Sequence, residues 1–192
     1  MSRVVVINHL TLDGVMQAPG RREEDTRGGF EHGGWAGPNV DEVVNAAMGA
    51  RMPRSGGLLL GRRSYEDMLG YWNTQDSPFK DMLNSAPKYV ASRTLREPLP
   101  WPNSTLLSGD VAEAVAQLRQ QPGKDLNVMG SRELIQTLMR HGLIDEYLLL
   151  IYPLVLGSGR RLFADGGPPA SLRLIDSTAS TTGVLIATYQ PS

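Results

Sequence analysis

The chain has 192 residues, of which 41% are apolar and 20% charged, with a formal net charge of −1. This is the size and composition of one globular domain, and the balanced charge argues against nucleic acid or an anionic membrane as a partner. Cysteine is absent and the three histidines, His9, His32 and His141, lie far apart, so we expect no thiol chemistry and no bound metal. An enzyme of this composition would borrow its reactive group from a cofactor.

The start of the chain, Met-Ser-Arg-Val-Val-Val, has none of the successive regions of a signal peptide. The most apolar run, residues 147–156, is too short to span a bilayer and contains Pro153, so a buried strand is predicted there. We therefore expect a cytoplasmic protein.

Short apolar runs alternate along the chain with segments of helical periodicity, which is typical of an α/β sheet. Several of these runs are apolar throughout, as expected for strands covered on both faces. The predicted strands are Arg3–Asn8, Gly57–Leu60, Lys88–Ala91, Thr105–Leu107, Asn127–Met129, Glu146–Tyr152 and Gly183–Tyr189. Because no linker separates these segments, we expect a single domain over residues 1–192.

The helical segments have apolar residues three and four positions apart. The predicted helices are Val40–Ala50, Ser64–Leu69, Val111–Gln120 and Arg132–Arg140. Asn39 is the candidate N-cap of the first helix, with Glu42 three residues later, and Ser64 precedes Asp67 in the same way. Residues 12–38 show no sustained period and are predicted to form a long loop, which is typical of a functional segment.

Three turns share one pattern, in which an apolar strand runs into a small, polar or basic turn. The first turn is Gly61-Arg62-Arg63-Ser64, the second is Ser92-Arg93 and the third is Gly130-Ser131-Arg132. Glycine permits close backbone approach, arginine offers fixed positive charge, and a helix start favours an anion. Each turn alone is also typical of a solvated loop. Their joint occurrence at the ends of strands favours a site for a nucleotide with several phosphates.

Other nucleotide and hydrolase motifs are absent from the sequence. There is no Walker A pattern, and residues 157–162 lack the third glycine of a dinucleotide fingerprint. The Gly-x-Ser-x-Gly elbow of α/β-hydrolases is also missing. The three turns therefore need a different fold to bring them together.

The order of motifs resembles the dihydrofolate reductase fold. More narrowly, it is similar to bacterial stand-alone proteins related to the C-terminal reductase domain of the riboflavin-biosynthesis deaminase–reductase (RibD). The three turns carry this resemblance, together with Leu12-Asp13-Gly14-Val15 near the start and residues 142–147, 153–163 and 182–189 in the second half. The resemblance covers nearly the whole chain and implies a three-layer αβα fold around a mixed, mostly parallel sheet.

The resemblance implies a reductase that binds NADPH and a small-molecule substrate, and that forms a homodimer. The first turn would grip the cofactor phosphates, and Ser92 and Arg93 would recognise the adenosine 2′-phosphate. The third turn would let the pyrophosphate lie close to the backbone. Dihydrofolate reductases hold the corresponding Gly-Gly bond in the cis form, and the geometry at Gly130–Ser131 is left open. Leu12 and Met16 match the flexible loop that covers the nicotinamide.

On the substrate side, the resemblance suggests an acidic residue at the start of the first helix, and Asp41 is the candidate proton donor, with bound water as the alternative. Trp35, Tyr65 and Trp72 are candidates to line an aromatic substrate slot, or else to pack in the core. Val15 occupies the position where the riboflavin enzyme usually carries a basic residue for its substrate's phosphate.

The function that follows is NADPH-dependent reduction of a small heterocyclic or carbonyl substrate. The nearest named reaction is reduction of 5-amino-6-(5-phosphoribosylamino)uracil, with dihydrofolate reduction as an alternative. A non-catalytic NADPH-binding sensor and a purely structural oligomerisation domain are the hypotheses of a different class. The hypothesis of a structural oligomerisation domain does not explain why the sequence has three phosphate-type turns.

Overall fold

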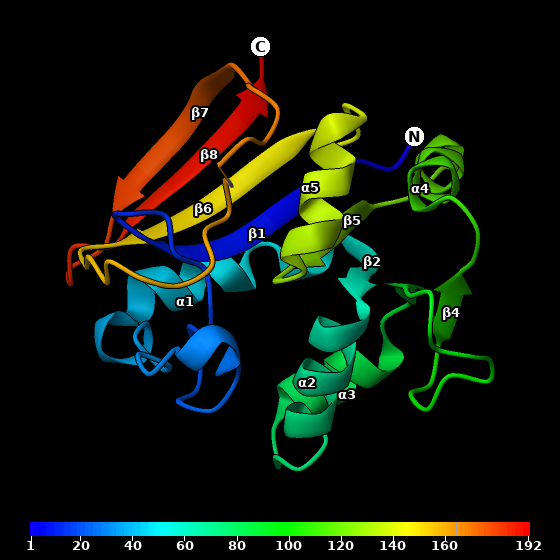
Figure 1. The fold of residues 1–192 in the computed structure, drawn as a ribbon, viewed down its shortest axis with the longest axis horizontal. Helices are drawn as coiled ribbons and strands as arrows, with labels where there is room; N and C mark the ends of the chain where they lie inside the picture. The colour runs from blue at the N-terminus through cyan, green and yellow to red at the C-terminus, as the bar shows by residue number, and fades with distance from the viewer. Residues whose placement is uncertain (164) are drawn as a thin grey trace. The chain divides into compact units, whose positions relative to one another are not determined.

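The computed structural model describes residues 1–163 and 165–192 and shows a mixed α/β fold (Figure 1). The strands are β1 (Val4–Thr11), β2 (Ser55–Gly61), β3 (Lys88–Ala91), β4 (Ser104–Leu107), β5 (Asp125–Met129), β6 (Glu146–Tyr152), β7 (Leu172–Ala179) and β8 (Leu185–Pro191). The α-helices are α1 (Glu42–Gly49), α2 (Arg62–Trp72), α3 (Pro78–Ser85), α4 (Val111–Gln120) and α5 (Arg132–Arg140). None of the described helices has the length and apolar character needed to cross a membrane.

The strand order is β4-β3-β2-β5-β1-β6-β8-β7. The strands β2, β3, β4 and β5 pair in parallel, whereas β8 pairs antiparallel with both β6 and β7. The prediction of a mixed α/β sheet is therefore confirmed. Its parallel part contains the strands that precede the three predicted phosphate turns.

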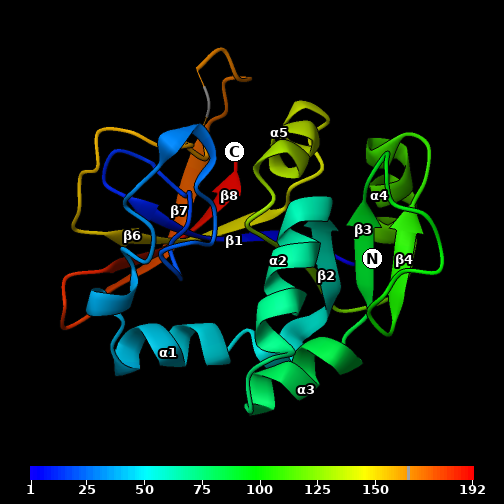
Figure 2. The same ribbon diagram turned by 60° about the horizontal axis from the view of Figure 1, so that its bottom comes forward.

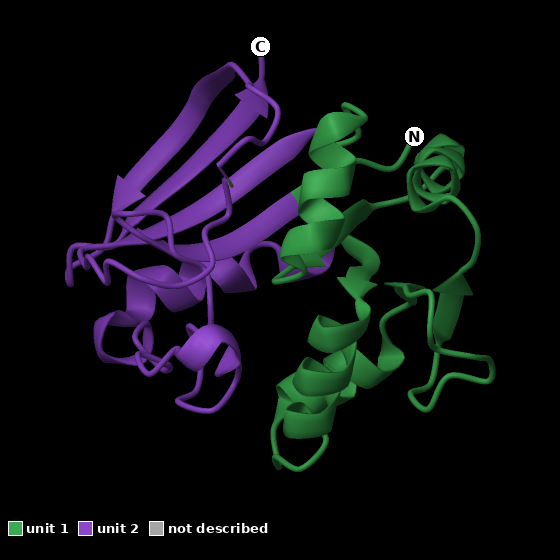
Figure 3. Cartoon of the chain, viewed as in Figure 1, with its two compact units in different colours: residues 1–5, 54–144 green, residues 6–53, 145–192 purple. Residues whose placement is uncertain are grey.

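The chain divides into two compact units (Figure 3). Unit 1 comprises Met1–Val5 and Arg54–Ile144, and unit 2 comprises Val6–Pro53 and Asp145–Ser192. Strand β1 begins in unit 1 and continues in unit 2, so the chain passes between the units within a strand. The expectation of a single domain stays a prediction.

The core of unit 1 includes one face of α2 packed against β2 and β3. Tyr65 and Leu69 of α2 are buried with Leu58, Leu60 and Val90 of the strands. Helix α3 lies next to α2 (Figure 2) and adds Leu83 to the same cluster. This packing fixes the start of α2 beside the end of β2, because Gly61 is both the last residue of the strand and the N-cap of the helix.

In unit 2, β6 is deeply buried, with every residue except Ile151 buried. This confirms the prediction made from its continuous apolar run. The neighbouring strand β8 is buried in its middle, and β7 at the edge of the sheet is exposed over nearly its whole length. Strand β7 was not predicted, because an exposed edge strand carries no apolar alternation for the sequence to show.

Two helix starts differ from the prediction. The N-cap of α1 is Asp41 and not Asn39, because the Asp41 carboxylate accepts a hydrogen bond from the Val44 amide at 2.9 Å. Helix α2 begins two residues earlier than predicted, with Gly61 and not Ser64 as N-cap. The Ser64 hydroxyl instead accepts the backbone amide of Ser131, as described below. Helix α3 was not predicted; it is short, begins at Pro78 and is capped by Ser77.

Candidate functional site

The three predicted turns lie together at the carboxyl edge of the parallel strands of unit 1. Strand β2 pairs with β3 on one side and with β5 on the other, and its last residue, Gly61, lies opposite Ala91. The segments that follow β3, β2 and β5 therefore leave three adjacent parallel strands at the same edge. This is the position at which open α/β sheets bind their ligands.

The first and third turns are joined by a reciprocal pair of serine hydrogen bonds. The Gly61 amide donates to Oγ of Ser131 at 2.9 Å, and the Ser131 amide donates to Oγ of Ser64 at 2.9 Å. Each hydroxyl thus accepts one bond from the protein. The described residues provide no acceptor for either hydroxyl hydrogen, so both are left to donate to a ligand.

The third turn has two successive residues in the left-handed region, Gly130 with φ 60° and Ser131 with φ 53°. A Cβ at Gly130 would lie 2.9 Å from Oγ of Ser64, so glycine is needed both for its conformation and for the close approach. Within the described residues the cis peptide bond is Glu97–Pro98, and Gly130–Ser131 is trans.

Two helices begin at this edge without a side-chain cap. Neither Gly61, the N-cap of α2, nor Ser131, the N-cap of α5, accepts a first-turn amide with a side chain. The first-turn N–H groups and the positive end of each helix dipole favour an anion at such a position.

The arginines of the site divide into held and free groups. Arg62 donates to Oε1 of Glu66 at 2.9 Å and to Oγ1 of Thr94 at 2.7 Å, so it links the first turn to the second. Arg63 and Arg93 are exposed and have no partner in the described part of the chain. They are therefore the guanidinium groups available for phosphates. In the first turn of α5, Nη1 of Arg132 lies 3.6 Å from Oε1 of Glu133.

The second turn is shaped by its serine. Oγ of Ser92 accepts the amides of Thr94 and Leu95 at 3.2 and 3.0 Å. Arg93 lies between Ser92 and these two residues, at the tip of the turn. The sequence predicts Ser92 as a direct phosphate ligand, and the structure shows that its hydroxyl also orders the turn that presents Arg93.

In unit 2, residues 12–16, which follow β1, are hydrogen-bonded to residues 154–162. The Asp13 carboxylate accepts the amides of Leu156 and Gly157 at 3.2 and 2.9 Å, and Arg161 donates to the Asp13 carbonyl at 2.8 Å. Leu12 is 65% exposed, whereas Met16 is buried. The resemblance leads us to expect a flexible loop here, and the structure instead ties its backbone to residues 154–162. Contact of Leu12 and Met16 with a nicotinamide stays a prediction.

Asp41 has a structural task. Besides capping α1, its carboxylate accepts the hydroxyl and amide of Thr181 at 2.7 and 2.8 Å and the amide of Thr182 at 3.3 Å. The Thr181 hydroxyl, followed by the Val44 amide, holds the pKa of Asp41 well below its usual range. A carboxylate that is ionised at neutral pH has no proton to give, so Asp41 is a poor candidate for the proton donor.

We expect Asp41→Asn to lower the stability of the protein at neutral pH while leaving turnover unchanged. A group with a lowered folded-state pKa stabilises the fold above its unfolded pKa, and that stabilisation is lost as the pH falls through the folded value. The stability difference between wild type and variant should therefore shrink in strong acid, as measured by urea unfolding at a series of pH values. Loss of turnover with unchanged stability would restore Asp41 as the proton donor.

Tyr65 is a packing residue, which corrects the expectation that it lines a substrate slot, whereas substrate contact of Trp35 and Trp72 stays a prediction. Tyr65 is 0% exposed; its hydroxyl donates to Oγ of Ser104 at 3.0 Å and accepts the Trp101 amide at 3.1 Å. A fully buried ring has no face for a ligand. Trp72 packs edge-on against Phe79 in the same core. Trp35 is buried in unit 2, with its indole N–H on the Gln17 carbonyl at 2.7 Å.

A titratable pair in unit 2 was not identified from the sequence. Nδ1 of His9 lies 2.8 Å from the hydroxyl of Tyr152, and the Trp35 ring meets the Tyr152 ring edge-on at 5.3 Å. Burial lowers the pKa of His9 to about 4 and raises that of Tyr152 to about 12, to which the Asp41 charge contributes. Only the nearly continuous apolar run that contains Tyr152 hinted that this hydroxyl would be buried and need a partner.

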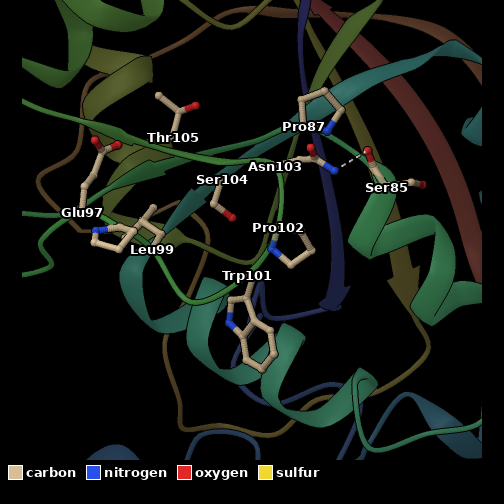
Figure 4. A pocket seen from close by; sticks show the side chains of 10 residues that line it. Ser85, Pro87, Glu97, Leu99, Trp101, Pro102, Asn103, Ser104 and Thr105 are labelled. Atoms are coloured by element: carbon tan, nitrogen blue, oxygen red, sulfur yellow. Dashed lines mark hydrogen bonds between the residues drawn. The ribbon is translucent and has the colours of Figure 1, made fainter.

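A cavity of about 570 Å³ lies at the opposite, amino end of β3 and β4 (Figure 4). Its lining includes Pro87, Pro98, Trp101 and Asn103, and the Asn103 amide donates to the carbonyls of Asn84 and Ser85. Because it faces away from the carboxyl edge, we do not assign it to the nucleotide site.

The sheet, with a parallel half that ends in three phosphate-type turns and an antiparallel half that closes the chain, defines a dihydrofolate reductase-like α/β protein. Dihydrofolate reductase from Enterococcus faecalis, complexed with NADP(H), has the same fold, with a TM-score of 0.59, 12% identity, and coverage of 99% of this chain and 96% of the reductase. The predicted three-layer fold class is confirmed.

The chain belongs to the RibD C-terminal domain family, whose model matches residues 3–186. The uncharacterised protein YyaP of Bacillus subtilis (strain 168) is 33% identical over 138 residues, 69% of this chain and 72% of YyaP. The crystal structure of a protein assigned to riboflavin biosynthesis in Shewanella sp. PV-4 is similar with a TM-score of 0.75 and 25% identity, covering 99% of both chains. The predicted resemblance is thus confirmed as family membership.

Proposed function

We propose that the protein is an NADPH-dependent reductase that transfers a hydride to a small heterocyclic or carbonyl substrate. The observation that carries this proposal is the meeting of three turns at the carboxyl ends of β3, β2 and β5, with two uncapped helix starts and two free arginines. Membership of a reductase family gives the chemistry its class. The three turns and the family membership both support NADPH as the cofactor.

The residues present suit the dinucleotide. The absence of a Cβ at Gly130 lets the Ser64 hydroxyl lie against the third turn, and Ser64 and Ser131 offer their hydroxyl hydrogens to a pyrophosphate there. Arg63 would face the phosphates at the start of α2, and Arg93 the adenosine 2′-phosphate. When bound, the nicotinamide supplies the hydride, and the chain orients the reactants and excludes water.

The test combines NADPH binding with NADPH oxidation. Purified protein is titrated with NADPH and NADH. NADPH oxidation is then followed with three acceptors: the pyrimidine 5-amino-6-(5-phosphoribosylamino)uracil, the pterin dihydrofolate and the quinone menadione. Tight binding with turnover of one class supports the proposal and names the substrate class. Binding without any turnover would favour the alternative of a non-catalytic sensor, and absence of binding would overturn the cofactor assignment.

Replacing Arg93 by alanine should remove the preference for NADPH over NADH. A hydrogen bond to a charged group contributes about 1.5–3 kcal/mol, so the Kd for NADPH should rise roughly 10- to 100-fold while that for NADH stays unchanged. Arg173→Ala, another exposed arginine but in β7, is the matched control and should change neither constant. An unaltered preference in Arg93→Ala would show that this turn does not read the 2′-phosphate.

The substrate side differs from the riboflavin enzyme at Val15. This side chain is 0% exposed, so it offers a substrate neither charge nor contact. We therefore rank the phosphorylated pyrimidine as the nearest named substrate by family membership alone, with dihydrofolate as the alternative. The homodimer and the cytoplasmic location expected from the sequence stay predictions; light scattering after gel filtration measures the former.

A further inference from the structure

Tyr152, the last residue of β6, is a buried phenol with a single partner. Its side chain is 0% exposed, and its hydroxyl lies 2.8 Å from Nδ1 of His9 in β1. The part of the chain that the structure describes offers this hydroxyl no other acceptor. A buried hydroxyl hydrogen without an acceptor costs free energy, so the Tyr152 hydrogen is donated to Nδ1 of His9.

This bond sets the tautomer of His9. Since Nδ1 accepts, the hydrogen of the neutral ring resides on Nε2. Burial, which lowers the His9 pKa to about 4, keeps the ring neutral at physiological pH, and the Tyr152 pKa of about 12 keeps the phenol protonated. The charge of Asp41 also raises the Tyr152 pKa, and the Trp35 ring meets the Tyr152 ring edge-on at 5.3 Å.

Nε2 of His9 is a donor that the described protein leaves unused. His9 is half-buried, and no described residue accepts a hydrogen bond from Nε2. Because the residue is only partly buried, Nε2–H is the group of the ring left for an acceptor from outside the described protein. His9 lies two residues before the end of β1, the carboxyl end at which α/β sheets bind ligands.

We infer that His9 contacts the substrate, with Nε2–H donating a hydrogen bond to the carbonyl oxygen or ring nitrogen of the hydride acceptor. Tyr152 is a positioning residue that fixes the tautomer and the ring orientation. The inference rests on the proposed reductase function and names the group that recognises its substrate. The substrate class is a small molecule with a hydrogen-bond acceptor at the atom adjacent to the reduced carbon.

Reduction of such an acceptor needs no charged acid from the protein. The acceptor carbon gains a hydride, negative charge develops on the adjacent oxygen or nitrogen, and the Nε2–H group stabilises that charge by a preorganised hydrogen bond. A proton from solvent water completes the reduction, and His9 remains neutral throughout. This assigns the substrate-side task to His9, whereas Asp41 is occupied as a cap.

The tautomer is measured by nitrogen NMR on protein labelled with ¹⁵N-histidine, with the His9→Gln variant to assign the signal. In the wild type we expect a neutral His9 with hydrogen on Nε2 across the neutral pH range. In Tyr152→Phe, His9 should exchange between both tautomers. A hydrogen on Nδ1 in the wild type would overturn the inference, and this readout needs neither cofactor nor substrate.

Substrate contact is measured on the NADPH-loaded protein with the three acceptors named above. An acceptor that is turned over should shift the His9 Nε2–H signal. His9→Ala should lower kcat/KM about 100-fold, the loss seen when one preorganised donor is removed, with the Kd for NADPH unchanged. His9→Gln, whose side-chain amide also donates, should recover most of that loss. His141→Ala, at an exposed histidine whose Nδ1 bonds the Thr137 carbonyl, is the control.

The outcomes separate the two proposals. Wild-type turnover that His9→Ala leaves unchanged would overturn the role of His9 and leave the reductase function standing. Failure of all three acceptors to perturb the Nε2–H signal in NADPH-loaded protein would do the same. Absence of NADPH binding in the wild type would overturn the proposed function, and with it the substrate contact.

Discussion

Gly130→Ala is expected to weaken NADPH binding about 100-fold, which corresponds to about 2.7 kcal/mol. Gly130 has φ 60°, and an added Cβ would lie 2.9 Å from Oγ of Ser64. To make room, the Ser64 hydroxyl must release the Ser131 amide, so the pair of bonds that joins the first and third turns opens.

The matched control is Gly142→Ala at the other end of α5. Gly142 has φ 61°, nearly the same as Gly130, but a Cβ there would meet nothing within 4 Å. Both variants carry the left-handed strain of about 1–2 kcal/mol, and the urea midpoint of Gly130→Ala should fall further because it also loses the Ser64–Ser131 bond. Only Gly130→Ala should lose NADPH affinity, measured by fluorescence titration. Equal affinities in the two variants would remove the third turn from the cofactor site.

Arg51→Ala is expected to destabilise the protein by about 3–5 kcal/mol, because it removes the guanidinium that is paired with a buried carboxylate. Nη1 of Arg51 lies 2.6 Å from Oε1 of Glu146, and the side chains are only 16% and 6% exposed. Thr188 and Gln190 complete the network, with Gln190 donating to the other Glu146 oxygen at 3.3 Å. Urea unfolding at neutral pH measures the loss.

Arg54→Ala serves as the control for removal of an arginine from an ion pair. Arg54 lies 3.6 Å from Asp125 but its side chain is 54% exposed, so the change should cost no more than about 1 kcal/mol. The double variant Arg51→Met with Glu146→Leu removes both charges and should recover most of the lost stability. A small effect of Arg51→Ala would mean that water reaches Glu146 and that the pair is not shielded.

Local patterns in the sequence were sufficient for most of the sheet. The bounds of β3 and β6 were predicted to the residue, because each is a short apolar run between residues that interrupt it. The same patterns located the three turns, since strand ends and helix starts are marked by glycine, serine and arginine. From these, the sequence determined the fold class and the family.

The tertiary structure decided which of the predicted side chains are available. Arg62 and Ser64 were both expected to meet phosphates, but Arg62 is held by Glu66 and Thr94, whereas Ser64 accepts the Ser131 amide and keeps its hydroxyl hydrogen for a ligand. Asp41 was the predicted proton donor at a helix start, but its carboxylate accepts a hydrogen bond from the hydroxyl of Thr181, 140 positions away. Glu66 is only four residues from Arg62, but Thr94, Ser131 and Thr181 are distant in sequence from the residues that they bind, so no local pattern reports those bonds.

The composition predicted that any chemistry would come from a cofactor, and the three turns predicted a nucleotide with several phosphates. The pairing of His9 with Tyr152 joins residues 143 positions apart, and only folding brings them within 2.8 Å. The physical reason is that hydrophobic periodicity and turn preferences act along the chain, whereas hydrogen bonds between side chains depend on which strands become neighbours. The three turns were therefore predictable from the sequence, and the pairing of His9 with Tyr152 was decided by the tertiary structure.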